Sequence, residues 1–411
     1  MIHFSKLLAA VAGGALLPLV LAAQEGKGTS CPRDPARAVT EKGVVRNVTG
    51  DPPCRLVFRK TGVRLTATPD GSWPDPGPTV VKDGHGRYYS ANADGWLSTI
   101  SVWSADGAYL ASFGSSGEGP GEFRGWYLSL FVDPADSLHV HDAANWTVFS
   151  PAQEFVRQAP SGWMGSGGPL RMEETIVLLY DGRILASNGH PSSGDAYFRM
   201  VNGDGTLEYT FGTAEDGTGA SGDYGHDRAI AYNRGHAGFW AAPSIEGASG
   251  YVLEHWSIES QTPDIVQSLR RRQPWFRWTG DSITSSWVGE LHITADGLLY
   301  VVVVRPSEEY VEAMKRYEHL KEEGGGGRWT PEIQEEIEAL DETLVHFVVE
   351  VIDTRSATLL ASDAYLLGDI MRGNPVLPQG LFRNEMTGYV YGVGEDGLPY
   401  VDIVEGVLER K

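Results

Sequence analysis

The chain has little positive charge. Its 411 residues include 33 Lys and Arg against 54 Asp and Glu, a formal net charge of -21 at pH 7. Nucleic-acid binding needs clustered Lys and Arg to neutralise phosphates, so this deficit predicts no nucleic-acid partner. It also disfavours adhesion to anionic lipid surfaces and favours solubility. The acidic surface either attracts cations and basic partners or is a solvated face.

Sequence signatures of common catalytic sites are missing as well. The chain contains no G-x-S-x-G elbow, no H-E-x-x-H pair and no Walker loop. The glycine-rich stretch 114–121 ends without a lysine and precedes no predicted helix, so it predicts no phosphate cradle. The sequence therefore identifies no catalytic residue and predicts no cofactor, with calcium or zinc left as the alternative.

The long apolar run of this chain is confined to its N-terminus. Residues 1–23 are predicted to be a secretory signal peptide, with Lys6 as its positive region, residues 7–21 as its apolar segment, and Ala22 and Ala23 before the cleavage site. An uncleaved anchor is the alternative, although the run is short for a membrane span. We expect no membrane span after cleavage and an exported protein, periplasmic or secreted.

Cysteine is almost absent. Cys31 and Cys54 both lie in a predicted N-terminal arm, residues 24–54. In an oxidising compartment a lone pair predicts one disulfide that pins the arm, and two unpaired thiols are the alternative. No C-x-x-C or Cys/His cluster accompanies them, which argues against zinc there.

What the chain has instead is glycine and aromatic residues: 51 Gly, 12 Trp and 17 Tyr. This composition fits many short strands joined by tight turns. From residue 79 onward, an apolar strand, a glycine turn, an aromatic-rich strand and a hairpin recur at a spacing of roughly 40–60 residues, which is typical of propellers. Pairs that tolerate positive φ mark the hairpins. They are Asp106-Gly107, Asp181-Gly182, Asp204-Gly205 and Asp296-Gly297.

One repeat is unusually clear. Residues 113–145, FGSSGEGPGEFRGWYLSLFVDPADSLHVHDAAN, resemble the repeat of NHL-type β-propellers, in which a GEGPGEF-like loop crosses between blades and an Asp follows the second strand. The resemblance is to NHL-repeat or TolB-like propellers of the exported bacterial type. It implies an all-β, six-bladed β-propeller over residues 55–411, with five or seven blades as alternatives. The last repeat lacks a strand, which the alternating segment 55–65 can supply, so we expect an N-terminal strand to close the ring.

Helical periodicity is confined to an insertion, residues 306–344, in blade five. Tyr310, Met314 and Tyr317 form one apolar stripe and a second follows a run of four glycines. We expect a helical hairpin, which either covers one mouth of the ring as a lid or decorates it.

Polar residues at strand ends define a predicted ligand-binding face. Its members are Asn92, Asp142, Asn145, Asn188 and Glu290. Four of them, all but Asn145, would also be the ligands if a metal lay on the ring axis, but the repeat aspartate and its equivalents equally suit turn capping.

Two further clusters allow a functional and a structural interpretation. His139 and His141 share one side of a predicted strand, as a metal pair or as part of the repeat. Residues 270–272, three arginines, either face an anionic partner or form a solvated loop.

The sequence thus predicts a non-catalytic binding or scaffold module for an unknown protein or small ligand. The alternative is a lactonase-like propeller hydrolase or lyase with an axial metal.

Overall fold

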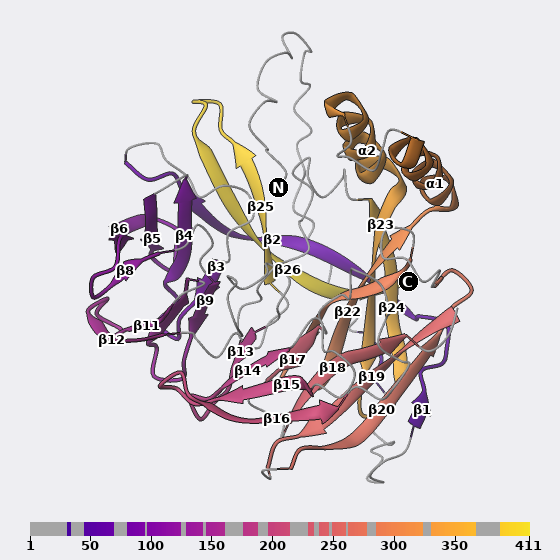
Figure 1. Ribbon diagram of the computed structural model, residues 1–411, viewed down its shortest axis with the longest axis horizontal. Coiled ribbons are helices and arrows are strands. Elements are labelled where there is room, and N and C mark those ends of the chain that lie inside the picture. Colours follow the sequence, from indigo (N-terminus) through magenta and orange to yellow (C-terminus); the bar gives the residue numbers. More distant parts are fainter. Residues whose placement is uncertain are drawn as a thin grey trace.

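The computed structural model shows an all-β chain folded as a six-bladed β-propeller, which confirms the predicted fold (Figure 1). The predicted signal peptide and most of the predicted N-terminal arm lie outside the described residues. The structure describes residues 31–33, 45–69, 80–94, 97–124, 129–142, 145–160, 176–187, 196–213, 229–233, 238–245, 249–259, 262–277, 285–323, 330–366 and 387–411.

The first three blades are four-stranded antiparallel sheets whose strands follow chain order from the middle of the ring outward. Blade 1 comprises β3 (Val80–Lys82), β4 (Tyr88–Asp94), β5 (Leu97–Trp103) and β6 (Tyr109–Phe113). Blade 2 comprises β9 (Ser129–Val132), β10 (Leu138–His141), β11 (Asn145–Phe149) and β12 (Phe155–Pro160). Blade 3 comprises β13 (Ile176–Leu178), β14 (Ile184–Ser187), β15 (Ala196–Val201) and β16 (Leu207–Thr213). The glycine-rich crossing between blades 1 and 2 forms a short parallel pair, β7 (Ser115–Ser116) with β8 (Glu122–Phe123).

Blades 4 to 6 depart from this plan because the N-terminal segment joins them. Blade 4 comprises β17 (Ile230–Tyr232), β18 (Gly238–Ile245), β19 (Gly250–Ser257) and β20 (Asp264–Arg272), with β1 (Val45–Asn47) added parallel to β20. Blade 5 comprises β21 (Trp287–Ile293), β22 (Leu298–Pro306), β23 (Val345–Asp353) and β24 (Thr358–Leu366). Blade 6 contains β25 (Thr387–Val393), β26 (Pro399–Arg410) and β2 (Cys54–Thr66).

Apolar side chains fill the spaces between neighbouring blades. Six buried clusters each join two consecutive blades around the ring, the last of them joining blade 6 to blade 1 through Leu65, Trp103 and Ile403. Full burial of one such large side chain stabilises the fold by about 1.5–3 kcal/mol. Because this burial lies between sheets, a single blade could not retain it alone.

Local sequence explains the turn between the first two strands of a blade. In blade 1, Oδ1 of Asp83 accepts hydrogen bonds from the backbone N–H groups of His85 and Arg87, at 3.0 and 2.8 Å. In blade 2, Asp133 accepts from Ala135 and Ser137 at 2.8 and 2.9 Å. An aspartate at the start of the turn therefore accepts hydrogen bonds from backbone N–H groups that have no partner in the strand pairing.

The ends of the described chain meet in blade 6. β2 pairs antiparallel with β26, from Cys54 opposite Arg410 to Thr66 opposite Tyr400. Asp402, which is 4% exposed, accepts hydrogen bonds from Nζ of Lys60 at 2.6 Å and from Nε of Arg64 at 2.6 Å. A basic N-terminal strand thus lies against an acidic C-terminal one.

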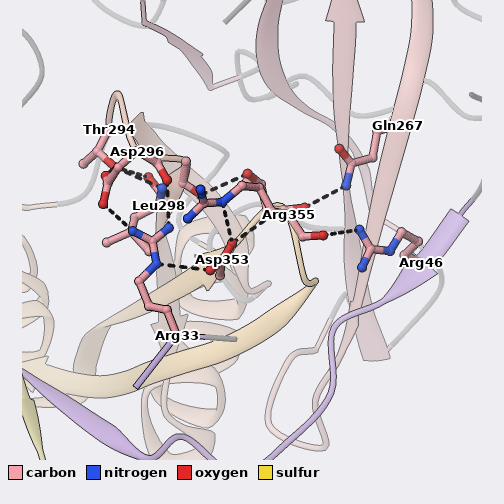
Figure 2. Close-up of polar contacts among 10 residues, drawn as sticks. Arg33, Arg46, Gln267, Thr294, Asp296, Leu298, Asp353 and Arg355 are labelled. Atoms are coloured by element: carbon pink, nitrogen blue, oxygen red, sulfur yellow. Dashed lines mark hydrogen bonds and ion pairs between the residues drawn. The ribbon is translucent and has the colours of Figure 1, made fainter. Parts of the chain in front are cut away.

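The N-terminal arm is held to the ring beyond this pairing. The predicted disulfide between Cys31 and Cys54 is confirmed. Figure 2 shows Arg33 reaching Asp296 and Asp353 in two turns of blade 5; its Nε donates to Oδ2 of Asp353 at 3.1 Å. Arg46 of β1 donates to the carbonyl oxygen of Arg355 at 3.0 Å. The arm therefore connects blades 4, 5 and 6.

Two helices, α1 (Glu308–Glu323) and α2 (Pro331–Leu344), lie between β22 and β23. Thr330 caps α2, its side chain accepting from the N–H of Ile333, and Pro331 opens the helix. The pair has its own apolar cluster, which includes Met314 and Ile337. Figure 1 draws both helices at the edge of the view, beside the ends of β22 and β23 and away from the middle of the ring. Neither described helix is long and apolar enough to cross a bilayer.

Candidate functional site

Asp142, a member of the predicted binding face, organises a loop of blade 2. It is fully buried; its Oδ2 accepts from the N–H of Arg124 at 2.8 Å and its Oδ1 from the N–H of Asn145 at 2.7 Å. The N–H of Asp142 in turn donates to the carbonyl oxygen of Asn145 at 3.1 Å. A buried carboxylate is tolerated when such donors compensate it. These bonds match the capping interpretation of the repeat aspartate.

The other amide residues of that face do not gather into a described site. Asn92 lies in β4 opposite Thr99, and its side chain lies outside what the structure describes. Asn145 begins β11 and is half-buried. Asn188 lies outside the described residues. Glu290 lies on β21, the first strand of blade 5 and an edge strand of its sheet.

His139 has a structural explanation. Trp146 Nε1 donates to its Nδ1 at 2.9 Å, so its Nε2 carries the proton and donates to Oδ2 of Asp133 at 3.1 Å. The turn aspartate of blade 1 has an equivalent contact, since the hydroxyl of Tyr89 donates to Asp83 at 3.1 Å. In blades 1 and 2, then, a side chain of the second strand donates a hydrogen bond to the turn aspartate, and His139 has this structural role in blade 2.

The second histidine of that strand is buried beside an aromatic ring. The ring centroids of His141 and Trp146 lie 5.7 Å apart, and burial lowers the pKa of His141 to about 3. Across the described residues, no group of three or more His, Cys, Asp and Glu side chains is placed to hold a metal ion.

Glu290 and His292 form the most unusual pair of ionisable side chains in the described ring. They alternate along β21 with Leu291 and Ile293, which are buried in the cluster between blades 4 and 5. Because strand side chains alternate between faces, Glu290 and His292 share the opposite face. Both are half-buried.

Aromatic and aliphatic residues line that face. His292 lies directly opposite Tyr300 of β22, with ring centroids 6.0 Å apart, and Glu290 lies opposite Val302. Tyr389, on β25 of blade 6, is near enough for the Glu290 charge to affect its pKa. Tyr300 and Val302 pack in the apolar cluster between blades 5 and 6, whereas Tyr389 packs in the cluster between blades 6 and 1.

The surroundings keep these groups uncharged at neutral pH. Burial raises the pKa of Glu290 to about 8 and lowers that of His292 to about 4. Burial likewise raises the pKa of Tyr300 to about 12, and that of Tyr389 to about 12 with a further contribution from Glu290. Glu290 is thus a protonated acid at pH 7, and His292 is a neutral imidazole.

Neither member of the pair is compensated within the described part of the chain. No hydrogen bond or opposite charge contributes to the pKa of Glu290, and the Nε2 atom of His292 has no hydrogen-bond partner there. The buried Nε2 atom of His292 is therefore an exception to the rule that buried polar atoms are hydrogen-bonded, whereas Glu290 is half-buried.

The sequence pattern predicts Glu290 at a strand end, but it lies in the middle of β21; His292 has no metal-ligand spacing to Glu290 and is not predicted by the pattern. The signal that could have joined them is strand alternation beside Leu291 and Ile293. Tyr389 is 99 residues beyond Glu290, and no local pattern links them.

The expectation of a solvated loop at residues 270–272 is wrong: they end β20. Arg271 is 7% exposed, and its Nε and Nη2 lie 3.0–3.2 Å from the carboxylate of Glu350, which has no exposed surface. Tyr251 also donates to Glu350, and Ser362 does so at 3.3 Å. The arginine is therefore part of a buried network between blades 4 and 5.

No family model matches the chain, and no curated protein sequence matches it. Among solved structures, a Bacteroides fragilis protein to which export is ascribed has 11% identity and a TM-score of 0.49, over 89% of this chain and 99% of the other. Streptogramin B lyase has 12% identity and a TM-score of 0.37, over 86% of this chain and 98% of the lyase. A Xanthomonas campestris gluconolactonase has 9% identity and a TM-score of 0.38, over 93% of this chain and 98% of the gluconolactonase. At these identities and TM-scores none assigns a family or an activity.

Proposed function

We propose that this chain is an exported β-propeller that binds a small ligand, without converting it, beside Glu290 on β21 of blade 5. The observation that carries the proposal is Glu290, a desolvated carboxyl group with no compensating partner among the described residues. Its half-buried position leaves part of the residue open to a ligand.

An ionisable group without a compensating partner lowers the stability of the fold. Removing a carboxyl group from water without a partner is unfavourable, and the fold gains nothing from it in the absence of a ligand. A bound molecule that pairs with Glu290 supplies the missing partner. Strongly shifted pKa values without a structural explanation are a feature of functional sites.

Export is supported by two independent features. Residues 1–23 have the pattern of a secretory signal. The disulfide between Cys31 and Cys54 is of the kind that forms and persists in oxidising compartments.

A thermal-shift screen tests the proposal. Amines, sugars, sugar acids and lactones are added to the mature protein, to Glu290→Gln, and to Glu405→Gln, which alters an exposed carboxyl group of β26. At least one class should raise the melting temperature of the wild type and of Glu405→Gln but not of Glu290→Gln. If no class does so, or if all three proteins respond equally, the proposal is wrong.

A second function is favoured by one specific observation. A carboxyl group with a pKa of about 8 is protonated at neutral pH and could serve as a general acid in a hydrolase or lyase. Incubation with glucono-δ-lactone tests this directly: turnover that Glu290→Gln abolishes, with Glu405→Gln unaffected, would favour the enzyme. Binding of the lactone without turnover would favour the binding module.

A further inference from the structure

Residues 45–49, which we call the clasp, are added to two blades that already have four strands each. The first part of the clasp is β1, which pairs parallel with β20 of blade 4. The N–H of Val48 continues this pairing by donating to the carbonyl oxygen of Arg270 at 2.8 Å. The carbonyl oxygen of Thr49 then accepts from the N–H of Leu359, on β24 of blade 5, at 3.4 Å. The clasp thus bridges the fourth strands of blades 4 and 5.

Ring closure does not involve the clasp. Blades 4 and 5 have four antiparallel strands of their own, and the ring is closed by β2, which pairs with β26 in blade 6. One side chain anchors the clasp: Val48 is 4% exposed and belongs to the apolar cluster between blades 4 and 5, whereas Val45 is 45% exposed. A short segment with one buried anchor has few contacts to set against the conformational freedom that it loses on docking.

The clasp is tethered on both sides. After it, Gly50 has a φ of 101°, a conformation that glycine adopts freely, and the chain continues to Cys54 at the start of β2. Before it, the disulfide ties Cys31 to the same strand, and Arg33 pairs with two turn aspartates of blade 5 (Figure 2). While the disulfide is intact, the clasp therefore belongs to a closed loop of chain.

Breaking the disulfide changes the undocked state of the clasp. With the bond intact, undocked residues still belong to a closed loop, whereas after reduction they belong to a tail with many more conformations. For cysteines 23 residues apart, the loop-closure entropy corresponds to a change on the order of 100-fold in the docking equilibrium. Reduction therefore weakens docking although it removes none of the clasp's own contacts.

We propose that the disulfide between Cys31 and Cys54 is a redox-sensitive switch, which docks the clasp when oxidised and releases it when reduced, while the ring stays closed. Cys31 is half-buried and Cys54 has no exposed surface, so a dithiol reaches the bond at the Cys31 sulfur. Thiol–disulfide exchange converts the dithiol to its own disulfide and leaves two thiols on the protein, so electrons and protons balance.

Release of the clasp has two consequences for blade 4. It exposes the edge of β20 at residues 268–270, which β1 covers in the docked state. It also uncovers Arg271, whose Nη1 donates to the carbonyl oxygen of Val48 at 3.4 Å. The switch is independent of the Glu290 site.

Hydrogen–deuterium exchange of the full chain, followed by mass spectrometry, tests the switch. The oxidised protein is compared with the same protein reduced by dithiothreitol and with the double variant Cys31→Ser, Cys54→Ser. The amides of the clasp should exchange at least tenfold and up to about 100-fold faster in both forms that lack the disulfide. The amides of β22 and β23, in the same ring, should stay protected over the same period in all three proteins.

A matched pair of variants tests the docking itself with the disulfide intact. Val48→Ala removes the buried anchor and should speed exchange of the clasp by about tenfold, whereas Val45→Ala alters an exposed side chain and should leave it unchanged. Should the double serine variant not fold, reduction of the folded oxidised protein gives the same comparison.

Three results would overturn the switch. The first is equal exchange of the clasp in the oxidised and reduced proteins. The second is loss of protection in β22 and β23 together with the clasp, because reduction would then unfold the blade instead of releasing the clasp. The third is a clasp that stays as protected in Val48→Ala as in the wild type.

Discussion

The buried pair of Arg271 and Glu350 offers a direct test of how blades 4 and 5 are held together. Arg271→Met keeps much of the side-chain volume and removes the charge. The Glu350 carboxylate, which has no exposed surface, then loses the contacts at 3.0–3.2 Å that compensate it. The remaining donors are the hydroxyl groups of Tyr251 and Ser362 and, at 3.5 Å, the side-chain amide of Gln273.

The expected cost follows from the burial of both partners. Removing one member of a buried ion pair destabilises a protein by about 3–5 kcal/mol, because the other charge stays buried without compensation. Two hydroxyl donors continue to bond Glu350, so we expect the lower end, about 3 kcal/mol. Neutralising the carboxylate as well, in Arg271→Met with Glu350→Gln, should recover most of that loss.

Urea unfolding at pH 7, followed by tryptophan fluorescence, measures these differences. Arg59→Met is the control, because Arg59 is half exposed and its pair with Glu409 is a surface pair worth about 1 kcal/mol or less. A stability of Arg271→Met within about 1 kcal/mol of the wild type would show that the buried charge of Glu350 does not need Arg271. A double variant that is no more stable than Arg271→Met would show that the loss does not come from the uncompensated charge.

Three further outcomes are expected. Asp402→Asn weakens the pairing of β2 with β26 and should lower stability by about 1–2 kcal/mol at low salt and by less at high salt, where urea midpoints measure it. Reducing Cys31–Cys54, which are 23 residues apart, should cost about 3 kcal/mol on the chain-entropy model, seen as a lower melting temperature that Cys→Ser variants reproduce. Burial alone would raise the pKa of Asp133, but hydrogen bonds from His139 and backbone N–H groups hold it at about 2. This stabilisation is complete above the ordinary pKa of 3.8 and is lost as pH falls toward 2. The melting temperature of Asp133→Asn should therefore depend less on pH over that range than that of the wild type.

Much of the fold was predictable because its determinants are local. The repeated turns depend on residues a few positions apart, such as Asp133 and the N–H groups of Ala135 and Ser137, and such patterns are visible in any single repeat. The disulfide followed from there being two cysteines and a predicted export signal. The fold class required no long-range information.

The candidate site was predictable only in part. Glu290 lies at a strand position that the repeat pattern identifies, but its shifted pKa depends on burial, which the local sequence does not encode. Asp142 was predicted on the same binding face as Glu290. In the folded loop, backbone N–H groups donate hydrogen bonds to both of its carboxylate oxygens. Asp142 follows the end of β10 and is compensated by its loop, whereas Glu290 lies in the middle of β21 and has no such loop.

Local sequence predicts the strands, their turns and the blade repeat, because backbone preferences and strand alternation act over a few residues, but it left five or seven blades as alternatives to six. The pairing of charges, in contrast, depends on the folded ring. Arg271 meets Glu350 across 79 residues, and Arg33 meets Asp353 across 320, because ring closure brings distant turns and strands together. Electrostatic compensation depends on distance in space, and in a propeller that distance is fixed by how the blades pack.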